Sequence, residues 1–266
     1  MYPILFEFRG FMISSFGAMM VVAFMVGNYC LRKDYLKIKK DPNIADDLTF
    51  NAAIGGIIGA KVYYLIENIP TGHALDNLNG LLNIIKGIFT LSLSTISMGI
   101  QSFGAGMVYW GGFIGGTIAV TVYIKKNKLE WFDTADMIAP YLVLCHGIGR
   151  IGCFLVGDDY GIPTSLPWGI SFPNGIPPTI VPVHPTQIYE MIIYFMIYKY
   201  LKNRTQKRTF SGEIISEYLF LAGISRFLVE FIRTNPKYLL GFSSAQYVSI
   251  IMMTIGSYFL WTNRRK

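Results

Sequence analysis

Seven separate stretches of this sequence are apolar enough to cross a lipid bilayer as helices, and this feature limits the fold more than any other. A spanning helix needs about 20 mostly apolar residues. The stretches cover residues 11–31, 51–69, 104–124, 137–156, 186–201, 214–232 and 238–261. The expected fold class is therefore all-α: a polytopic membrane helix bundle with seven transmembrane helices.

Composition supports a membrane protein. Hydrophobic residues make up 52% of the chain and charged residues only 15%, against about 25% charged in an ordinary soluble domain. This balance excludes a disordered chain and most soluble enzymes. The three cysteines, Cys30, Cys145 and Cys153, lie in or beside apolar stretches and form neither a disulfide framework nor a CxxC metal motif. No segment is long enough for a separate soluble domain, so we expect one integral membrane domain over residues 1–266.

Basic residues give the expected orientation. The net charge of +7 would suggest nucleic acid as a partner of a soluble protein, but in a membrane protein it more often marks cytoplasmic loops. Four basic clusters follow the first, third, fifth and seventh stretches. They share one side of the membrane only if the chain crosses seven times. The positive-inside rule then predicts an outer N-terminus and a cytoplasmic C-terminus, and we expect no nucleic-acid partner.

One further apolar segment, residues 87–99, is short for a span at 13 residues. A crossing there would move three of the four basic clusters to the opposite side of the membrane. We therefore expect an interfacial or re-entrant segment.

Ionisable residues within predicted spans are costly in a membrane and suggest function. They gather in three places, and the expected topology puts the arginines toward the outer side. Together with the neutral Gln187 and the charged or titratable residues just beyond the span ends, the three groups are His146, Arg150 and Asp158; His184, Gln187 and Glu190; and Arg226, Glu230 and Arg233.

Two arginines converging from different helices suit a phosphate, because each guanidinium fork can bind phosphate oxygens bidentately. A phosphate at that depth belongs to a phospholipid head group. The alternative is purely structural pairing, of Arg150 with Asp158 or Glu190 and of Arg226 with Glu230. A metal site formed by His146, His184 and an aspartate lacks a ligand spacing, so we expect no metal.

The motifs around these residues resemble those of a known family. Residues 149–161, GRIGCFLVGDDYG, resemble the prolipoprotein diacylglyceryl transferase signature, roughly G-R-x-G-N-F-x-N-x-E-x-x-G. Residues 184–190, 223–233 and 110–115 resemble the family's H-P-[ST]-Q-x-Y-E, R-x-x-x-E-x-x-R and H-G-G-x-x-G segments. The motifs keep the family's order and approximate spacing, from about Phe11 to the tail.

The resemblance implies a transferase of lipoprotein biosynthesis in the bacterial cytoplasmic (inner) membrane, with multiple spans and no cofactor. Its substrates would be phosphatidylglycerol and preprolipoprotein signal peptides that bear a lipobox cysteine. By position, Arg150 and Arg226 match the two essential arginines, and Arg150 would contact the lipid. The expected substrate-binding residues are Arg150, Asp158, Gly161, His184, Gln187, Glu190, Glu230 and Arg233.

The chain also departs from the family pattern. Trp110 replaces the histidine of the H-G-G segment, and Cys153 and Val156 replace the signature asparagines. Phe16 and Ala222 stand where tyrosines are expected.

These departures leave several alternatives open. His146, one helical turn before Arg150, is a candidate base, the alternative being a histidine that only packs between helices. Cys153 is either a nucleophile or a small apolar filler. The chain as a whole is best interpreted as an active transferase. Two other hypotheses remain: a phosphatidylglycerol-binding relative with lost or altered acceptor chemistry, and a transporter or scaffold with structural arginines.

Overall fold

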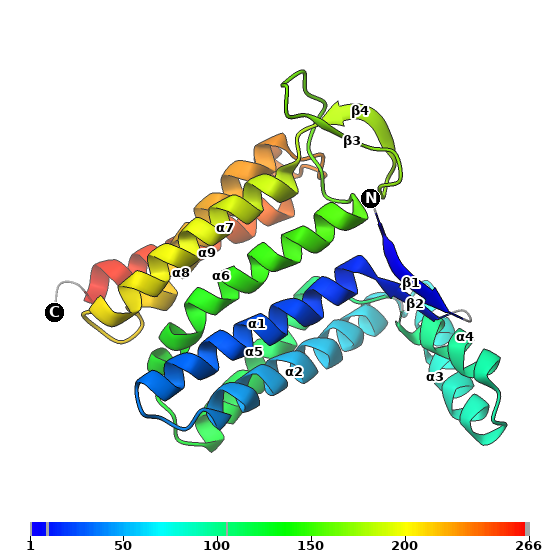
Figure 1. The fold of residues 1–266 in the computed structure, drawn as a ribbon, viewed down its shortest axis with the longest axis horizontal. Coiled ribbons are helices and arrows are strands. Elements are labelled where there is room, and N and C mark those ends of the chain that lie inside the picture. The colour runs from blue at the N-terminus through cyan, green and yellow to red at the C-terminus, as the bar shows by residue number, and fades with distance from the viewer. Residues whose placement is uncertain (1, 9–10, 105, 264–266) are drawn as a thin grey trace. The chain divides into compact units, whose positions relative to one another are not determined.

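In the computed structural model, which describes residues 2–8, 11–104 and 106–263, the chain is mostly helical (Figure 1). A helix underlies every predicted stretch. These helices are α1 (Ser15–Lys37), α2 (Asn43–Glu67), α5 (Tyr109–Lys126), α6 (Trp131–Val156), α7 (Thr186–Arg204), α8 (Glu213–Val229) and α9 (Ser244–Asn263). Within the described residues, α1, α2 and α6 are each long and apolar enough to span a membrane by length and composition. The helical membrane class is thus confirmed, while the seven crossings and the orientation stay predictions.

Two small β-hairpins add to the helices that the sequence predicts. The first pairs β1 (Ile4–Phe8) with β2 (Phe11–Ser14). The second pairs β3 (Ile170–Phe172) with β4 (Thr179–Val183) in antiparallel register. The β3–β4 hairpin lies in the long loop between α6 and α7 (Figure 1).

The described chain divides into two compact units. The first contains α1 and α6 to α9, and α6 packs against α1, α7 and α8 within it. Its core contains Val143 of α6, Leu201 of α7 and Ile214 of α8, all fully buried. Close approach of α1 to α6 depends on Gly152, because a Cβ there would lie 3.2 Å from the Cα of Phe16.

A buried carboxylate fixes the start of α8. Asp136 of α6 accepts hydrogen bonds from the backbone N–H of Gly212 at 2.8 Å and of Ile215 at 2.9 Å. An acceptor at this place satisfies N–H groups that have no partner within the helix. Arg208 pairs with the same carboxylate at 3.0 Å. The helix that carries Arg226 therefore starts from a fixed point.

The second unit contains α2 to α5. Glycines line the contact between α2 and α5: a Cβ on Gly59 would lie 2.2 Å from the carbonyl oxygen of Gly111. Only glycine permits this backbone approach. One lysine of this unit, Lys61, is buried and donates to Asn77 at 3.0 Å and to the carbonyl of Gly106 at 3.2 Å.

The segment 87–99, expected to be interfacial or re-entrant, is not one element. It straddles the turn of a helical hairpin formed by α3 (His73–Phe89) and α4 (Leu93–Gly104). Gly87 and Gly99 belong to different arms, and a Cβ on Gly99 would lie 2.6 Å from the carbonyl oxygen of Gly80. Small residues bring the two arms together. Its location relative to the membrane stays a prediction.

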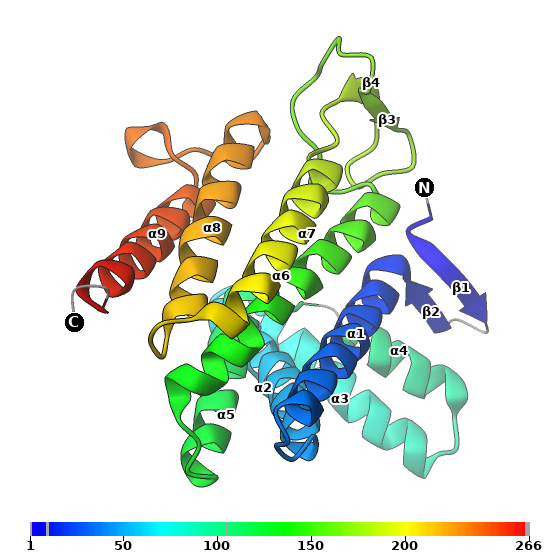
Figure 2. The same ribbon diagram turned by 60° about the vertical axis from the view of Figure 1, so that its left-hand side comes forward.

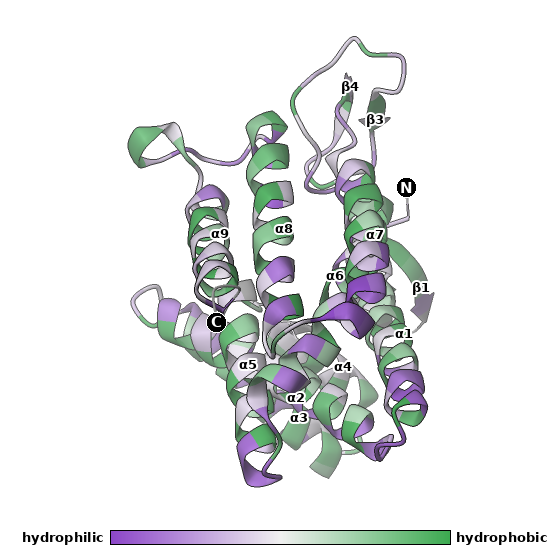
Figure 3. Cartoon of the chain, turned by 90° about the vertical axis from the view of Figure 1, so that its left-hand side faces the viewer, coloured by the Kyte–Doolittle hydropathy of each residue, from purple (hydrophilic) through white to green (hydrophobic). Residues whose placement is uncertain are grey.

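Hydrophilic residues gather at the C-terminal ends of α1, α5 and α7 (Figure 3). These ends carry basic residues in their last turn: Lys37 in α1, Lys125 and Lys126 in α5, and Lys202 and Arg204 in α7. Basic side chains at a helix C-terminus also complement the negative end of the helix dipole.

Candidate active site

Charged side chains from α6, α7 and α8 meet at one end of the first unit. Arg150 lies near the end of α6, Glu190 near the start of α7, and Arg226 near the end of α8. The three helix ends lie on the side of the β3–β4 hairpin (Figure 2). A short 3₁₀ helix, η2 (Glu230–Ile232), and the loop after α6 complete the group. Segments distant in sequence thus assemble one charged site.

Glu190 forms the centre of this site. Its Oε2 lies 2.9 Å from Nε of Arg150, and its Oε1 lies 2.9 Å from Nη1 of Arg226. Arg233 approaches Oε2 with Nη1 at 3.5 Å. The Glu190 side chain is 0% exposed, whereas those of Arg150 and Arg226 are 18% and 22% exposed. A buried carboxylate therefore holds two arginines whose outer surfaces are accessible.

Glu230 forms the second buried anion. Its Oε2 lies 2.9 Å from Nη2 of Arg226, one helical turn earlier, and 3.8 Å from Nε of Arg233. Asn235 donates to its Oε1 at 2.6 Å. The expected grouping of Arg226, Glu230 and Arg233 is therefore present in the structure, and Glu190 joins it to Arg150.

Asp159, which sequence reasoning did not select, closes the group. Its Oδ2 lies 2.8 Å from Nη1 of Arg150, and its Oδ1 pairs with Nη2 of Arg233. Burial disfavours its charge, but the positive charges of Arg233 and Arg150 outweigh burial and lower the pKa of Asp159. The available signal was the pair of adjacent aspartates directly after Gly157.

Of the two partners considered for Arg150, the structure pairs it with Glu190, and among the described residues Asp158 forms no ion pair with it. Gly157 ends α6 in a left-handed conformation with φ 76°, and the following turn presents Asp159 to the arginines instead. Oδ1 of Asp158 is buried and has no hydrogen-bond partner among the described residues. Burial, together with the charge of Asp159, raises the pKa of Asp158.

The backbone of this turn is anchored by the start of α7. Gln187 donates from Nε2 to the carbonyl oxygen of Asp158, and Thr186 donates from Oγ1 to that of Asp159 at 2.6 Å. Both side chains are fully buried. In this structure Gln187 therefore holds the main chain of the loop in place by a hydrogen bond.

Gly161 allows three segments to meet. Its N–H donates to the carbonyl oxygen of His184 at 2.9 Å, and it forms a β-bridge with Arg233. A Cβ on Gly161 would lie 2.5 Å from the carbonyl oxygen of Ile232. The glycine thereby sets the backbone position from which Arg233 reaches the site.

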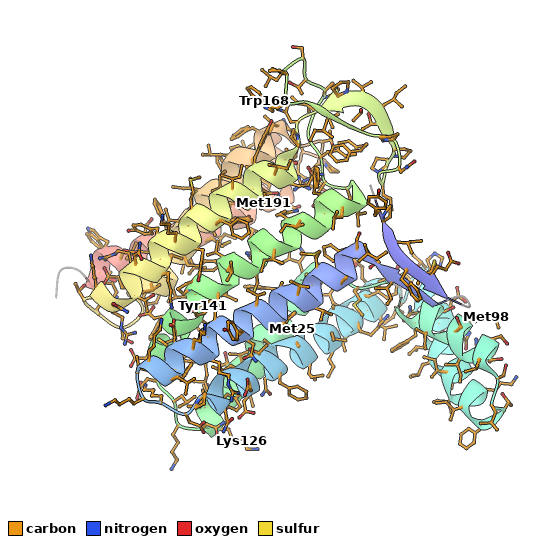
Figure 4. All side chains as sticks on the ribbon, viewed as in Figure 1. Met25, Met98, Lys126, Tyr141, Trp168 and Met191 are labelled. Atoms are coloured by element: carbon orange, nitrogen blue, oxygen red, sulfur yellow. The ribbon has the colours of Figure 1, made fainter. Side chains whose placement is uncertain are left out.

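His184 lies beside the charged group, where its carbonyl oxygen accepts the N–H of Gly161. Its Nδ1 lies 3.3 Å from the hydroxyl of Tyr189. Trp168, labelled in Figure 4, donates from Nε1 to that hydroxyl at 2.8 Å. His184 thus helps attach the loop that carries Trp168 to α7.

His146 and Cys153 lie on either side of Arg150 along α6. The His146 ring packs against Tyr194 with centroids 5.7 Å apart, and the residue is exposed. Cys153 is buried, and Nη1 of Arg150 lies 3.5 Å from its Sγ. His146 is therefore close in sequence to the site, while Cys153 belongs to its wall.

The remaining family departures are apolar side chains. Ala222 is buried within α8, and Phe16 lies on α1 where it packs against Gly152. Trp110 belongs to the second unit, at the start of α5. Neither Phe16 nor Ala222 can donate or accept a side-chain hydrogen bond.

Metal binding has one candidate group among the described residues: the ligand atoms of Cys153, Asp158 and Asp159 lie within 4.8 Å of one another. Asp159 is already paired with two arginines, and Arg150 also contacts Cys153. Guanidinium groups at these distances repel a cation. The set of His146, His184 and an aspartate that we considered from sequence is not part of this group.

Apolar helices and a partly exposed cluster of arginines around buried carboxylates define the chain as a helical membrane protein with a site suited to an anion. A family model described as prolipoprotein diacylglyceryl transferase matches residues 3–262, so the chain belongs to this family. The family resemblance stated from the motifs is confirmed.

Named relatives agree with the family match. The chain is 34% identical to a phosphatidylglycerol–prolipoprotein diacylglyceryl transferase from Clostridium tetani, over 96% of this chain and 95% of the relative. It is 32% identical to a protein named phosphatidylglycerol–prolipoprotein diacylglyceryl transferase 2 from Clostridium perfringens, over 95% and 92%. It is 31% identical to a similarly named protein from Vibrio atlanticus, over 99% and 91%.

Proposed function

We propose that this chain transfers the diacylglyceryl group of phosphatidylglycerol to the lipobox cysteine thiol of a preprolipoprotein. A sulfur–carbon bond forms at the carbon of the diacylglyceryl group that carries the phosphate, and the bond between that carbon and the phosphate oxygen breaks. Glycerol phosphate leaves, and a base takes the thiol proton. The reaction is the first step of lipoprotein maturation.

One observation carries this proposal: Arg150 and Arg226, from different helices, converge on the same buried carboxylate. The side chains of Arg150 and Arg226 are 18% and 22% exposed, so each arginine keeps an accessible surface for a ligand. Donors held in place before the reaction stabilise negative charge as it develops. The charge here develops on the departing phosphate.

The other residues divide between support and chemistry. Glu190, Glu230 and Arg233 orient the two arginines, while Asp158, Gly161, His184 and Gln187 shape the loop around the lipid head group. His146 is our candidate base for the thiol, because a thiolate is the nucleophilic form. The alternative, purely structural role of the ion pairs is compatible with transfer, since the same pairs fix the arginines.

The proposal includes a topology. The chain forms one integral membrane domain in the bacterial cytoplasmic membrane, crosses it seven times, and has its N-terminus outside. Basic ends of α1, α5 and α7 then face the cytoplasm, as the positive-inside rule requires. The charged site lies at the opposite ends of α6 and α7, toward the outer surface.

Complementation tests this function in cells. In bacteria depleted of their own transferase, this chain should restore lipid attachment to a reporter lipoprotein, and its Arg150→Ala variant should not. The variant must be present in the membrane at an equal amount. Failure of the unmodified chain to lipidate any reporter would contradict the proposal.

A further inference from the structure

Asp159 differs from the other two carboxylates that bind the arginines. Glu190 and Glu230 have side chains 0% and 1% exposed, whereas the Asp159 side chain is 40% exposed. It contacts Arg150 and Arg233 from the open side of the group. It is therefore the one of these three anions that lies at the surface of the group, and its departure exposes the guanidinium of Arg233, whose side chain is 3% exposed while Asp159 is in place.

The Asp159 carboxylate can move while its backbone stays in place. The backbone carbonyls of Asp158 and Asp159 are held by Gln187 and Thr186. Asp159 has a φ of 61°, in the left-handed region that aspartate tolerates better than most residues. Rotation about the side-chain bonds is then sufficient to release both arginines.

We propose that Asp159 occupies the place of a phosphate group on Arg150 and Arg233, and that the phosphate of a bound ligand displaces it. This inference rests on the proposed function for the identity of the lipid. The chemistry recognised is a phosphate ester, whether it belongs to a phospholipid head group or to free glycerol phosphate. Asp159 does not contact the reacting atoms and acts as a positioning residue.

Charge explains why such an exchange helps turnover. The group contains three arginines and three carboxylates, so its formal charge is zero. A phosphodiester carries one negative charge, like the carboxylate it displaces, and neutrality is preserved. The released phosphate monoester carries about −1.5 to −2 at neutral pH. The product therefore brings more negative charge into the site than the Asp159 carboxylate does. The return of Asp159 to the arginines restores neutrality and promotes release of the product.

The test measures phosphate affinity in Asp159→Asn, in nanodiscs, beside the unmodified chain. Asparagine keeps the size of the side chain and removes its charge. The matched control is Glu130→Gln, which removes an exposed negative charge at the start of α6. At 1.5 Å per residue it lies about 30 Å from Arg150 along the helix axis.

We expect Asp159→Asn to bind free glycerol phosphate roughly tenfold more tightly, equivalent to about 1.4 kcal/mol. KM for phosphatidylglycerol should fall, and kcat should fall with it because the product leaves slowly. Glu130→Gln should leave both constants unchanged. A purely structural Asp159 would instead give unchanged or weaker phosphate binding in the folded variant, which overturns the inference.

Two further arms keep the outcomes distinct. Nanodiscs of phosphatidylglycerol or phosphatidylcholine, each with and without glycerol phosphate, separate recognition of the lipid from recognition of a free phosphate ester. If Asp159→Asn is unstable, Asp159→Ala is measured by thermal unfolding, and glycerol phosphate should raise its melting temperature more than that of the unmodified chain. An equal or smaller rise overturns the inference.

Binding and transfer also fail independently. No transfer by the unmodified chain, with phosphate binding still strengthened in Asp159→Asn, removes the proposed function and supports the exchange. Transfer by the unmodified chain, with phosphate binding unchanged in Asp159→Asn, supports the proposed function and overturns the exchange.

Discussion

Oε1 of Glu190 lies 2.9 Å from Nη1 of Arg226, and the carboxylate that makes this contact is fully buried. Its other oxygen lies 2.9 Å from Nε of Arg150. The two helices that carry Arg150 and Arg226 are thus joined through a third helix, which carries Glu190. This relationship makes the ion pairs part of both the stability and the chemistry of the site.

Glu190→Ala should destabilise the first unit strongly. Removing one member of a buried ion pair leaves uncompensated charge and costs about 3–5 kcal/mol, and here three arginines lose a partner. Thermal unfolding in detergent measures the loss, with exposed Glu130→Ala as the control. Equal melting temperatures for Glu190→Ala and the control would contradict a central role for Glu190.

Replacing either site arginine by lysine should abolish most transfer. Arg150 binds Glu190 and Asp159 through different nitrogens of one planar group, and the single ammonium of lysine cannot reproduce this fork. Loss of one preorganised donor commonly lowers kcat about 100-fold or more. The control is Arg32→Lys, because Arg32 lies near the C-terminal end of α1, away from the site loop. Full activity in Arg150→Lys would show that charge alone suffices.

Two glycines near the site should differ in how well they tolerate replacement by alanine. At Gly161 the new Cβ would meet the carbonyl oxygen of Ile232 at 2.5 Å, and a backbone atom cannot move aside easily. At Gly149, beside Arg150, the new Cβ would lie 3.9 Å from Sδ of Met20, which is an ordinary contact. Overpacking costs about 1–3 kcal/mol. Gly161→Ala should therefore lose stability and activity, whereas Gly149→Ala should keep both, as unfolding and transfer assays will measure.

Asp158→Asn should stabilise the protein at neutral pH. Burial raises the pKa of Asp158, so the folded state holds this proton more tightly than the unfolded chain does. The stability that this group contributes therefore falls as the pH rises above 3.8, the ordinary pKa of the carboxyl group. The stabilising effect of asparagine should shrink as pH falls toward that value. Melting temperatures across pH check the slope, and a lower melting temperature at neutral pH would contradict it.

Transfer by Asp158→Asn should nevertheless fall, because this position belongs to the proposed lipid-binding loop. A gain in stability with a loss of activity is the usual result when a strained functional group is relieved. Unchanged transfer would remove Asp158 from the substrate site.

His146 variants separate a base from a packing residue. The ring packs against Tyr194 at 5.7 Å between centroids, and phenylalanine can preserve that contact without accepting a proton. If His146 deprotonates the thiol, His146→Ala and His146→Phe should both lose transfer, by roughly 100-fold. Retained activity in His146→Phe would assign the histidine to packing, and retained activity in His146→Ala would exclude it as the base.

The sequence predicted the structure best where the pattern is a long run of apolar residues or involves residues close together in the chain. Each apolar stretch contains a helix, since a run of about 20 apolar residues has few other solutions. At 87–99, expected to be interfacial or re-entrant, composition did not reveal that glycine contacts hold two helices against each other. In the stretch 104–124, the helix α5 begins at Tyr109.

The site shows the same limit. Spacing along a helix groups Arg226 with Glu230, but it does not reveal that Glu190 unites both arginines across three helices. Choosing Asp159 over Asp158 would have required knowledge of the turn after Gly157, where one left-handed residue decides which carboxylate faces Arg150. Family motifs identified the position of the signature acid and gave no information about its neighbour.

The most direct measurement is transfer in proteoliposomes that contain phosphatidylglycerol and a lipobox peptide. The unmodified chain and Arg150→Ala are compared by the mass of the peptide and by the glycerol phosphate released. We predict a diacylglyceryl mass gain on the cysteine and an equal amount of glycerol phosphate, with the unmodified chain only. Phosphatidylglycerol bound in an Arg150-dependent way without any peptide product would contradict the account and leave a lipid-binding relative with a different acceptor.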